Sequence, residues 1–225
     1  MKRGILLLVL VFLLFPIISA DILIKQQPDD VYNLGDVVKF PLKILSSKDI
    51  NSFLSISLIC SDFDSEVHKE FISLDAGDEI SLSPKIPLIS DFVNSSDICK
   101  AKIIFGSDYV LSKQFKVSDK LSLLVENYSQ EFYPEQEIIL QGEVKKETGD
   151  LIDSGFIELN LNHTNASNSI KLSDTIENGL FFINYTLPKD VPSGEYKGEL
   201  SVHQKDIDNI KINSGVKEIS FSVKQ

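Results

Sequence analysis

Residues 137–144, EIILQGEV, alternate apolar and polar side chains along most of their length. Ile138 and Leu140 share one face, and Gln141 falls on the other. A period of two residues is typical of a β-strand with one buried face. The same alternation recurs between turn residues in GFIELNLN (155–162), SIKLSD (169–174), GLFFINYTL (179–187), GEYKGELSV (194–202) and VKEISFSV (216–223). Few stretches have the 3.6-residue period of a helix, so the pattern predicts an all-β fold of antiparallel β-sandwiches.

The first half of the chain resembles the second. YNLGDVVKFPLKI (32–44) aligns with YPEQEIILQGEV (133–144) at an offset of 101 residues. A period of about 100 residues matches the size of one β-sandwich and is too long for a solenoid repeat. We therefore predict two tandem β-sandwich domains, residues 21–118 and residues 119–225.

Residues 1–20, MKRGILLLVLVFLLFPIISA, have the order of a secretory signal peptide. Two basic residues precede an apolar run from Ile5 to Phe15, and small residues follow up to Ala20. The run is shorter than the roughly 20 residues that a membrane-spanning helix needs. We expect cleavage after Ala20 and a protein that is secreted or held at the extracellular cell surface. The alternative is an uncleaved membrane anchor.

The composition excludes one class of partner. The chain has 22 basic and 33 acidic residues and a formal net charge of −11. The N-terminal segment holds two of the basic residues and none of the acidic ones, so the exported part would carry −13. The exported part would also lack Arg and Trp, which commonly bind phosphates and stack on bases. Nucleic acid is therefore not an expected partner.

Both cysteines lie in strand-like surroundings within the predicted exported part. Cys60 ends the alternating stretch FLSISLIC (53–60), and Cys99 begins the alternating stretch CKAKIIF (99–105). In each stretch the cysteine falls on the apolar face. Two inward-facing cysteines in an oxidising compartment are expected to pair, and two thiols alone do not complete a zinc site. We predict a Cys60–Cys99 disulfide that spans the core.

Two longer segments, FYPEQEIILQGEV (132–144) and ENGLFFINYTLPKDVPSGEYKGELSV (177–202), resemble immunoglobulin-like and macroglobulin-type domains of secreted and cell-surface proteins. The resemblance implies two tandem Ig-like or macroglobulin-like sandwiches and a role in adhesion, scaffolding or spacing. The core Trp of antibody-type domains is missing. In PSGEY, Pro192 and Gly194 favour a tight turn. We expect Tyr196 to enter the core and to bond a backbone group through its hydroxyl, as in a tyrosine corner.

Five N-x-S/T sequons are available for glycosylation in an exported chain. They begin at Asn94, Asn127, Asn162, Asn165 and Asn184. Around the last of these, the strand pattern places Ile183 on the inner face and Asn184 on the outer face. We therefore expect the Asn184 acceptor to face solvent.

No catalytic motif is present, and we predict no catalytic residue, no cofactor and no metal ligand. His68, His163 and His203 lie outside metal-binding motifs and are expected at the surface. Two acidic segments, SDFDSE (61–66) and KDIDN (205–209), have oxygen ligands at alternate positions, as a calcium loop requires. Each is better explained as a polar turn between strands.

These observations favour a non-catalytic structural or adhesion module that acts through protein or glycan contacts. One alternative is a carbohydrate-binding module, for which Tyr128, Phe132 and Tyr133 are the clustered aromatic residues. Another is an accessory subunit or inhibitor of an exported enzyme complex. The expected partner is a cell-surface protein or glycan, and a membrane only if the N-terminal segment stays uncleaved. Nothing in the sequence indicates an oligomeric state.

Overall fold

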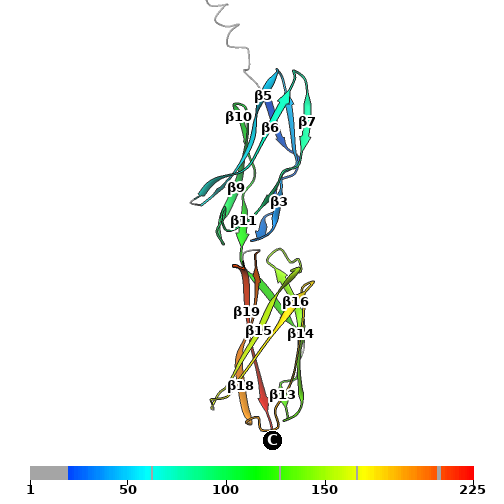
Figure 1. The fold of residues 1–225 in the computed structure, drawn as a ribbon, viewed down its shortest axis with the longest axis vertical. Coiled ribbons are helices and arrows are strands. Elements are labelled where there is room, and N and C mark those ends of the chain that lie inside the picture. The colour runs from blue at the N-terminus through cyan, green and yellow to red at the C-terminus, as the bar shows by residue number, and fades with distance from the viewer. Residues whose placement is uncertain (1–19, 62, 127, 166, 207–208) are drawn as a thin grey trace, which may run out of the picture. The chain divides into compact units, whose positions relative to one another are not determined.

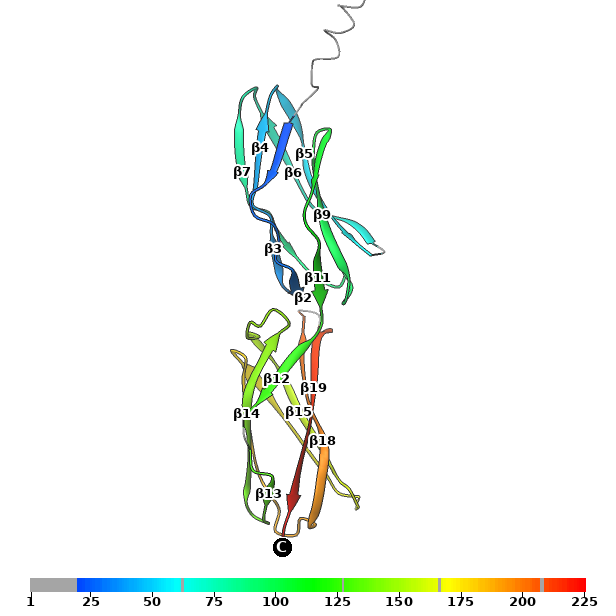
Figure 2. The same ribbon diagram turned by 180° about the vertical axis from the view of Figure 1, so that it is seen from behind.

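The computed structural model describes residues 20–225 apart from 62, 127, 166, 207 and 208, and it is all-β, as predicted (Figure 1 and Figure 2). The part of the chain that the structure describes contains no helix, and hence none that could cross a bilayer. The predicted signal peptide lies outside the described residues except for Ala20, which begins the first strand.

The strands of the first half are β1 (Ala20–Ile24), β2 (Val31–Asn33), β3 (Val37–Lys39), β4 (Leu42–Ser46), β5 (Ile50–Cys60), β6 (Phe63–Leu74), β7 (Glu79–Leu82), β8 (Lys85–Pro87), β9 (Ile98–Phe105), β10 (Asp108–Leu111) and β11 (Phe115–Ser118). The strands of the second half are β12 (Leu121–Val125), β13 (Glu131–Phe132), β14 (Glu137–Lys146), β15 (Ser154–His163), β16 (Ser169–Glu177), β17 (Leu180–Thr186), β18 (Gly194–Lys205) and β19 (Lys211–Val223). All six strands predicted from alternation in the second half are present.

Internal contacts divide the chain into two compact units. The first unit holds Val37–Ile86, Cys99–Gln114 and the described part of Met1–Pro28. The second unit holds Asp29–Asp36, Pro87–Ile98 and Phe115–Gln225. The domain boundary expected near residue 118 stays a prediction.

The sheets of the two halves have the same strand order. In the first half, one sheet runs β1-β4-β7, a larger one runs β2-β11-β9-β5-β6 with β10 on β9, and β3 pairs with β8. In the second half one sheet runs β12-β14-β17-β16-β15-β18-β19-β13. Its strands β16 and β17 are joined through the single pair Glu177–Leu180, so the sheet can be divided there. The set β12-β14-β17 then corresponds to β1-β4-β7, and the set β13-β19-β18-β15-β16 corresponds to β2-β11-β9-β5-β6. In both halves the short strand β2 or β13 pairs in parallel with the last strand.

One turn repeats its backbone hydrogen bonds in both halves. In the turn Asn33–Asp36, the Gly35 N–H donates to the Leu88 carbonyl at 2.9 Å, and the Asp36 carbonyl accepts the Leu88 N–H at 2.8 Å. In the turn Tyr133–Gln136, the Glu135 N–H donates to the Leu187 carbonyl at 3.1 Å, and the Gln136 carbonyl accepts the Leu187 N–H at 2.9 Å. The sequence repeat is therefore also a repeat of local geometry.

An aromatic pair beside this turn corrects the alignment of the repeat. Tyr32 meets Phe115 edge-on with ring centroids 5.5 Å apart, and Phe132 meets Phe221 in the same way at 5.2 Å. Phe132 is therefore the counterpart of Tyr32, at an offset of 100 residues. The predicted offset of 101, which matched Tyr32 with Tyr133, was wrong at this turn. It matched two residues of the same type, whereas the residue that packs as Tyr32 does is Phe132.

The predicted inner faces are buried in both halves. The buried residues of these faces are Leu54, Ile56, Leu58, Cys60, Cys99, Ala101, Ile103, Phe105, Ile138, Leu140, Val144, Ile157, Leu159, Leu161, Tyr196, Leu200 and Val202. The hydroxyl of Tyr196 donates to the Pro192 carbonyl at 3.1 Å, which confirms the predicted backbone bond. Burial disfavours the ionised form and raises the pKa of Tyr196.

Candidate functional site

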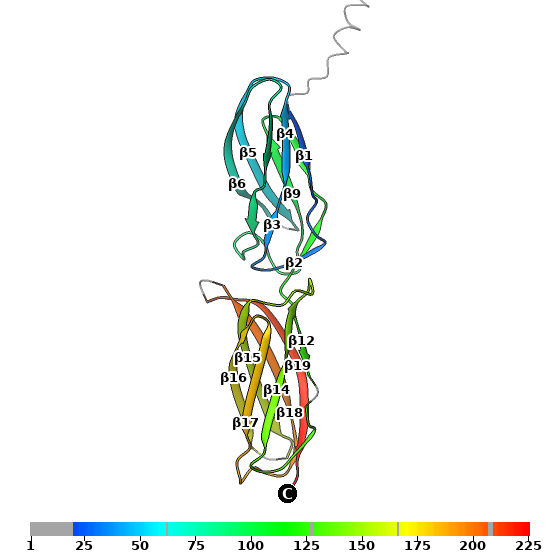
Figure 3. The ribbon, with the colours of Figure 1, turned by 90° about the vertical axis from the view of Figure 1, so that its right-hand side faces the viewer.

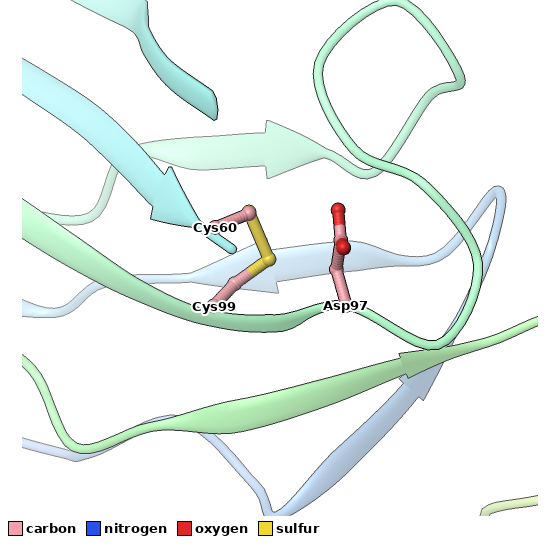
Figure 4. A group of neighbouring side chains, drawn as sticks. All are labelled: Cys60, Asp97 and Cys99. Atoms are coloured by element: carbon pink, nitrogen blue, oxygen red, sulfur yellow. A yellow bond between two sulfur atoms is a disulfide. The ribbon is translucent and has the colours of Figure 1, made fainter. Parts of the chain in front are cut away.

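The predicted disulfide forms between Cys60 and Cys99 (Figure 4). The two residues are directly opposed in the neighbouring strands β5 and β9, with Cα atoms 4.1 Å apart. The bond therefore joins two strands of one sheet, and the prediction that it spans the core was wrong. Alternation shows which side of a strand a residue faces, but it does not show which strands are neighbours. The carboxylate of Asp97 lies within 4.8 Å of both sulfurs, but sulfurs bonded to each other are not thiolate ligands.

The sequon asparagines that the structure describes are exposed. They are Asn94, Asn162, Asn165 and Asn184. Asn127 lies outside the described residues. As predicted, Ile183 is buried while Asn184 faces outward from β17.

The prediction that all three histidines lie at the surface was wrong for His163. This ring is buried and meets Tyr196 edge-on, with centroids 5.0 Å apart. One ring nitrogen lies 3.0 Å from the Ser193 carbonyl, and Nδ1 accepts the Asn165 N–H at 3.0 Å. His163 continues the inward alternation of β15, and this signal could have placed it in the core. The other two histidines are half-buried.

The prediction that each acidic segment is a polar turn fits Asp206 of the second segment and is wrong for Asp64 and Glu66 of the first, which lie within strand β6. Asp62 and Asp208 lie outside the described residues. The carboxylate of Asp206 accepts the Ile210 N–H at 2.8 Å and so closes a turn. Glu66 lies within strand β6 and not in a loop.

The aromatic residues predicted for carbohydrate binding do not form an exposed cluster. Phe132 is buried against the core, so the prediction that it could contact a sugar was wrong. Tyr133 is half exposed, and Tyr128 is half-buried with its hydroxyl 3.4 Å from the Ser220 carbonyl.

A different set of aromatic side chains is exposed on one sheet face of the first unit. Phe53 on β5, Phe71 on β6 and Tyr109 on β10 have relative exposures of 52%, 57% and 64%. We call this surface the aromatic face. Together with Lys69 and Lys102, these residues lie on the outer side of the strands β6-β5-β9-β10, whose arrangement can be followed in Figure 1.

The two-residue period of a β-strand explains why these rings face outward. Leu54 is fully buried, so Phe53 next to it faces outward. Phe53 and Phe71 are a directly opposed cross-strand pair, and their ring centroids are 5.4 Å apart with planes inclined by 72°. Tyr109 pairs with Ile104 on β9, the strand next to β5. Tyr109 therefore lies two strand spacings, about 10 Å, from the β5 backbone.

Positive charge surrounds the rings. The Nζ of Lys69 lies 5.4 Å from the centroid of Phe53, and the Nζ of Lys102 lies 5.4 Å from that of Tyr109. Lys100 shares the outward side of β9 with Lys102. Two carboxylates share this face, because Glu66 and Asp64 pair with the outward-facing Ser57 and Ile59 of β5. Three lysines against two carboxylates leave one excess positive charge here, in a chain with a formal net charge of −11.

One of the two carboxylates on this face, Glu66, has local hydrogen-bond donors. The Ser55 hydroxyl donates to Glu66 at 2.6 Å, and the Lys69 ammonium donates at 3.3 Å. These bonds hold the pKa of Glu66 below its ordinary value, the Ser55 bond having the larger effect. Glu66 therefore stays ionised near neutral pH and offsets Lys69, which leaves Lys100 and Lys102 against the single carboxylate of Asp64.

The sequence contained part of the signal for the aromatic face. The alternation that places Leu54 in the core places Phe53 outside, and the same rule applied to buried Ile72 places Phe71 outside. The missing information was that β5 pairs with β6 and β9 with β10.

The fold and site define an all-β, disulfide-bonded protein with three exposed aromatic side chains on one sheet face. No family model matches the chain, and no relative is found among curated proteins. Among solved structures, the chain is similar to a β-glucosidase from Listeria innocua, determined alone and in complex with gluconolactone or glucose. The two complexes have a TM-score of 0.37 and 13% identity, and the enzyme alone has 0.38 and 12%. Each match covers 44% of this chain and 16% of the enzyme chain, and a similarity this weak carries no argument about function.

Proposed function

We propose that the protein is a non-catalytic secreted or cell-surface module that binds its partner through the aromatic face. The observation that carries the proposal is the exposure of Phe53, Phe71 and Tyr109 on one sheet surface. Removing apolar area from water stabilises a complex by about 25 cal/mol per Å² before the costs of association are subtracted. Aromatic side chains are also among the residues that most often dominate binding energy.

The charge on this face points to an acidic partner. Lys100 and Lys102 lie on the outward side of β9, and the ammonium of Lys102 lies over the ring of Tyr109. Complementary charge speeds association and excludes partners of like charge. An acidic protein surface or an acidic glycan fits this combination of rings and lysines.

We further propose that residues 21–118 and 119–225 are tandem Ig-like sandwiches. Three observations support this architecture: the matching strand order of the two halves, the parallel pairing of β2 with β11 and of β13 with β19, and the Tyr196–Pro192 bond. The disulfide differs from that of antibody domains, which joins the two sheets.

Export is supported by three independent features. The pattern of residues 1–20 is typical of a signal peptide. A buried structural disulfide is typical of an oxidising compartment. The described sequon asparagines are exposed and available to a transferase.

A binding assay with paired phenylalanine variants tests this function. Purified protein is titrated against cell envelopes from the organism that produces it, and bound protein is measured. Loss of both rings in Phe53→Thr/Phe71→Thr should weaken binding at least about tenfold, since a pair of central aromatic contacts contributes more than 1.4 kcal/mol. Thr keeps a high strand propensity, so circular dichroism should be unchanged.

Phe156→Thr is the matched control for this assay. Phe156 is also an exposed strand residue, with a relative exposure of 42% and with the Nζ of Lys205 5.1 Å from its ring centroid. Its loss should leave binding unchanged. If Phe156→Thr weakened binding as much as the double variant does, the result would contradict the proposal.

Carbohydrate binding is the second candidate, and the same exposed rings favour it. Aromatic rings two strand spacings apart could each contact the apolar face of a sugar. Envelopes treated with periodate lose sugar rings, and envelopes treated with protease lose proteins. Binding that survives protease and disappears after periodate would assign a glycan partner, and the reverse result would assign a protein partner.

A further inference from the structure

The second unit has its own exposed apolar surface on the strands β14 and β17. Phe182 and Ile139 have relative exposures of 52% and 43%. These two strands pair antiparallel, as Figure 3 shows, and Ile139 is directly opposite Asn184. Phe182, Asn184 and Thr186 are all exposed on alternate positions of β17, so they share one face. The sequon therefore lies beside a small apolar patch of Phe182 and Ile139, on a face that also carries Glu137 and Gln141.

From this register we propose that Asn184 carries an N-linked glycan whose first sugar packs on Phe182 and Ile139. The inference rests on the proposed export of the chain. Phe182 lies two residues before Asn184, about 7 Å along the strand. That spacing lets a sugar attached to the Asn184 side chain fold back with its apolar C–H face on the ring. Covering the ring removes apolar area from water, which stabilises the folded glycoprotein.

The modification is an ordinary group transfer. The amide nitrogen of Asn184 forms a bond to C1 of the sugar, and the bond from C1 to the oxygen of a lipid-linked diphosphate breaks. The lipid diphosphate leaves with the electron pair, and the amide proton passes to a base of the transferase. The co-reactant is the lipid-diphosphate-linked oligosaccharide of the export compartment.

The surroundings of Asn184 differ from those of the other strand-borne sequon. Asn162 on β15 is directly opposite Ser169 and Lys197, and the residue two before it is Asn160. A sugar at Asn162 would meet polar side chains. The stabilising contact should therefore be specific to Asn184, which makes Asn162 the matched control.

The test uses the full chain secreted from a eukaryotic host. Peptide mass spectrometry measures sugar at each sequon, and thermal melts compare Asn184→Gln with the unchanged protein. Loss of the sugar at Asn184 should lower the melting temperature by about 4 °C, the shift expected for loss of one aromatic contact in a domain of this size. In a Phe182→Thr background, the same Asn184→Gln change should shift it by about 1 °C or less. Asn162→Gln should leave it unchanged.

Each contrary result has a distinct meaning. Secreted protein with sugar at other sequons but none at Asn184 overturns this inference and leaves the proposed export intact. Protein retained in the cell without sugar at any sequon contradicts both. An equal shift from Asn184→Gln with and without Phe182 shows that the sugar does not pack on the ring. Self-association of the sugar-free protein that Phe182→Thr abolishes would instead assign the patch to a second copy.

Discussion

Replacing Cys60 and Cys99 together with Ala removes a cross-link between two buried strand positions. The bond closes a segment with a sequence separation of 39 residues. In the chain-entropy treatment, opening such a loop returns about 13 cal/mol/K to the unfolded chain, or about 4 kcal/mol at 25 °C. The oxidised protein should therefore be about 4 kcal/mol more stable than the variant before any change in packing is counted.

Urea unfolding followed by far-ultraviolet circular dichroism measures this difference. The variant should have a lower midpoint and a steeper dependence on urea, because its unfolded chain exposes more surface once the loop is open. Each single variant already breaks the bond. We therefore expect Cys60→Ala and Cys99→Ala each to lose most of the 4 kcal/mol, with a strongly non-additive double variant.

The unchanged protein in a reducing agent is the control, since it retains both sulfur atoms without the bond. Its stability should approach that of the double variant. A double variant within about 1 kcal/mol of the oxidised protein would refute the loop-closure reasoning. So would two single variants whose effects simply add.

Tyr196→Phe removes the hydrogen bond to the Pro192 carbonyl and should lower the free energy of unfolding, measured in urea, by about 1 kcal/mol. The raised pKa of Tyr196 also predicts that the melting temperature falls above pH 10.0, because there the tyrosine ionises in the unfolded chain before it ionises in the folded one. Glu135 has a φ of 65°, a left-handed conformation that favours glycine, so Glu135→Gly should raise the unfolding free energy by about 1 kcal/mol, and a decrease would contradict this. Burial lowers the pKa of His203, so the unfolded chain takes up a proton first and the melting temperature should drop below pH 6.5. The Lys116 and Ser118 bonds lower the pKa of Glu147, which predicts a further drop below pH 4.5 that Glu147→Gln removes.

Features that depend on the period of two could be predicted from sequence. The alternation in residues 155–162 placed Ile157 and Leu159 in the core, where both are fully buried. The pairing of Cys60 with Cys99 was equally accessible, because both face inward and the chain has two cysteines. In each case a local rule was sufficient.

Features that depend on strand neighbours could not be predicted in this way. The disulfide joins two strands of one sheet, although inward alternation is equally compatible with two facing sheets. Phe132 was misassigned because its burial depends on the pairing of a two-residue strand with β19. The aromatic face combines Phe53, Phe71 and Tyr109, which are separated along the chain and become neighbours only through the pairing of β5, β6, β9 and β10.

The exposed rings of Phe71 and Phe182 differ in what lies beside them on the outer face of the sheet. On β6, the residue two positions before Phe71 is Lys69; on β17, the residue two positions after Phe182 is the sequon Asn184. None of the five sequons begins within the strands that form the aromatic face. Because an N-linked sugar is bulky and well hydrated, it would cover an apolar patch and exclude a protein from it. A lysine leaves the ring accessible and adds a charge that an acidic partner can bind. The same exposed residue type therefore predicts a sugar-covered surface at Phe182 and, within the three-ring aromatic face, a binding surface at Phe71.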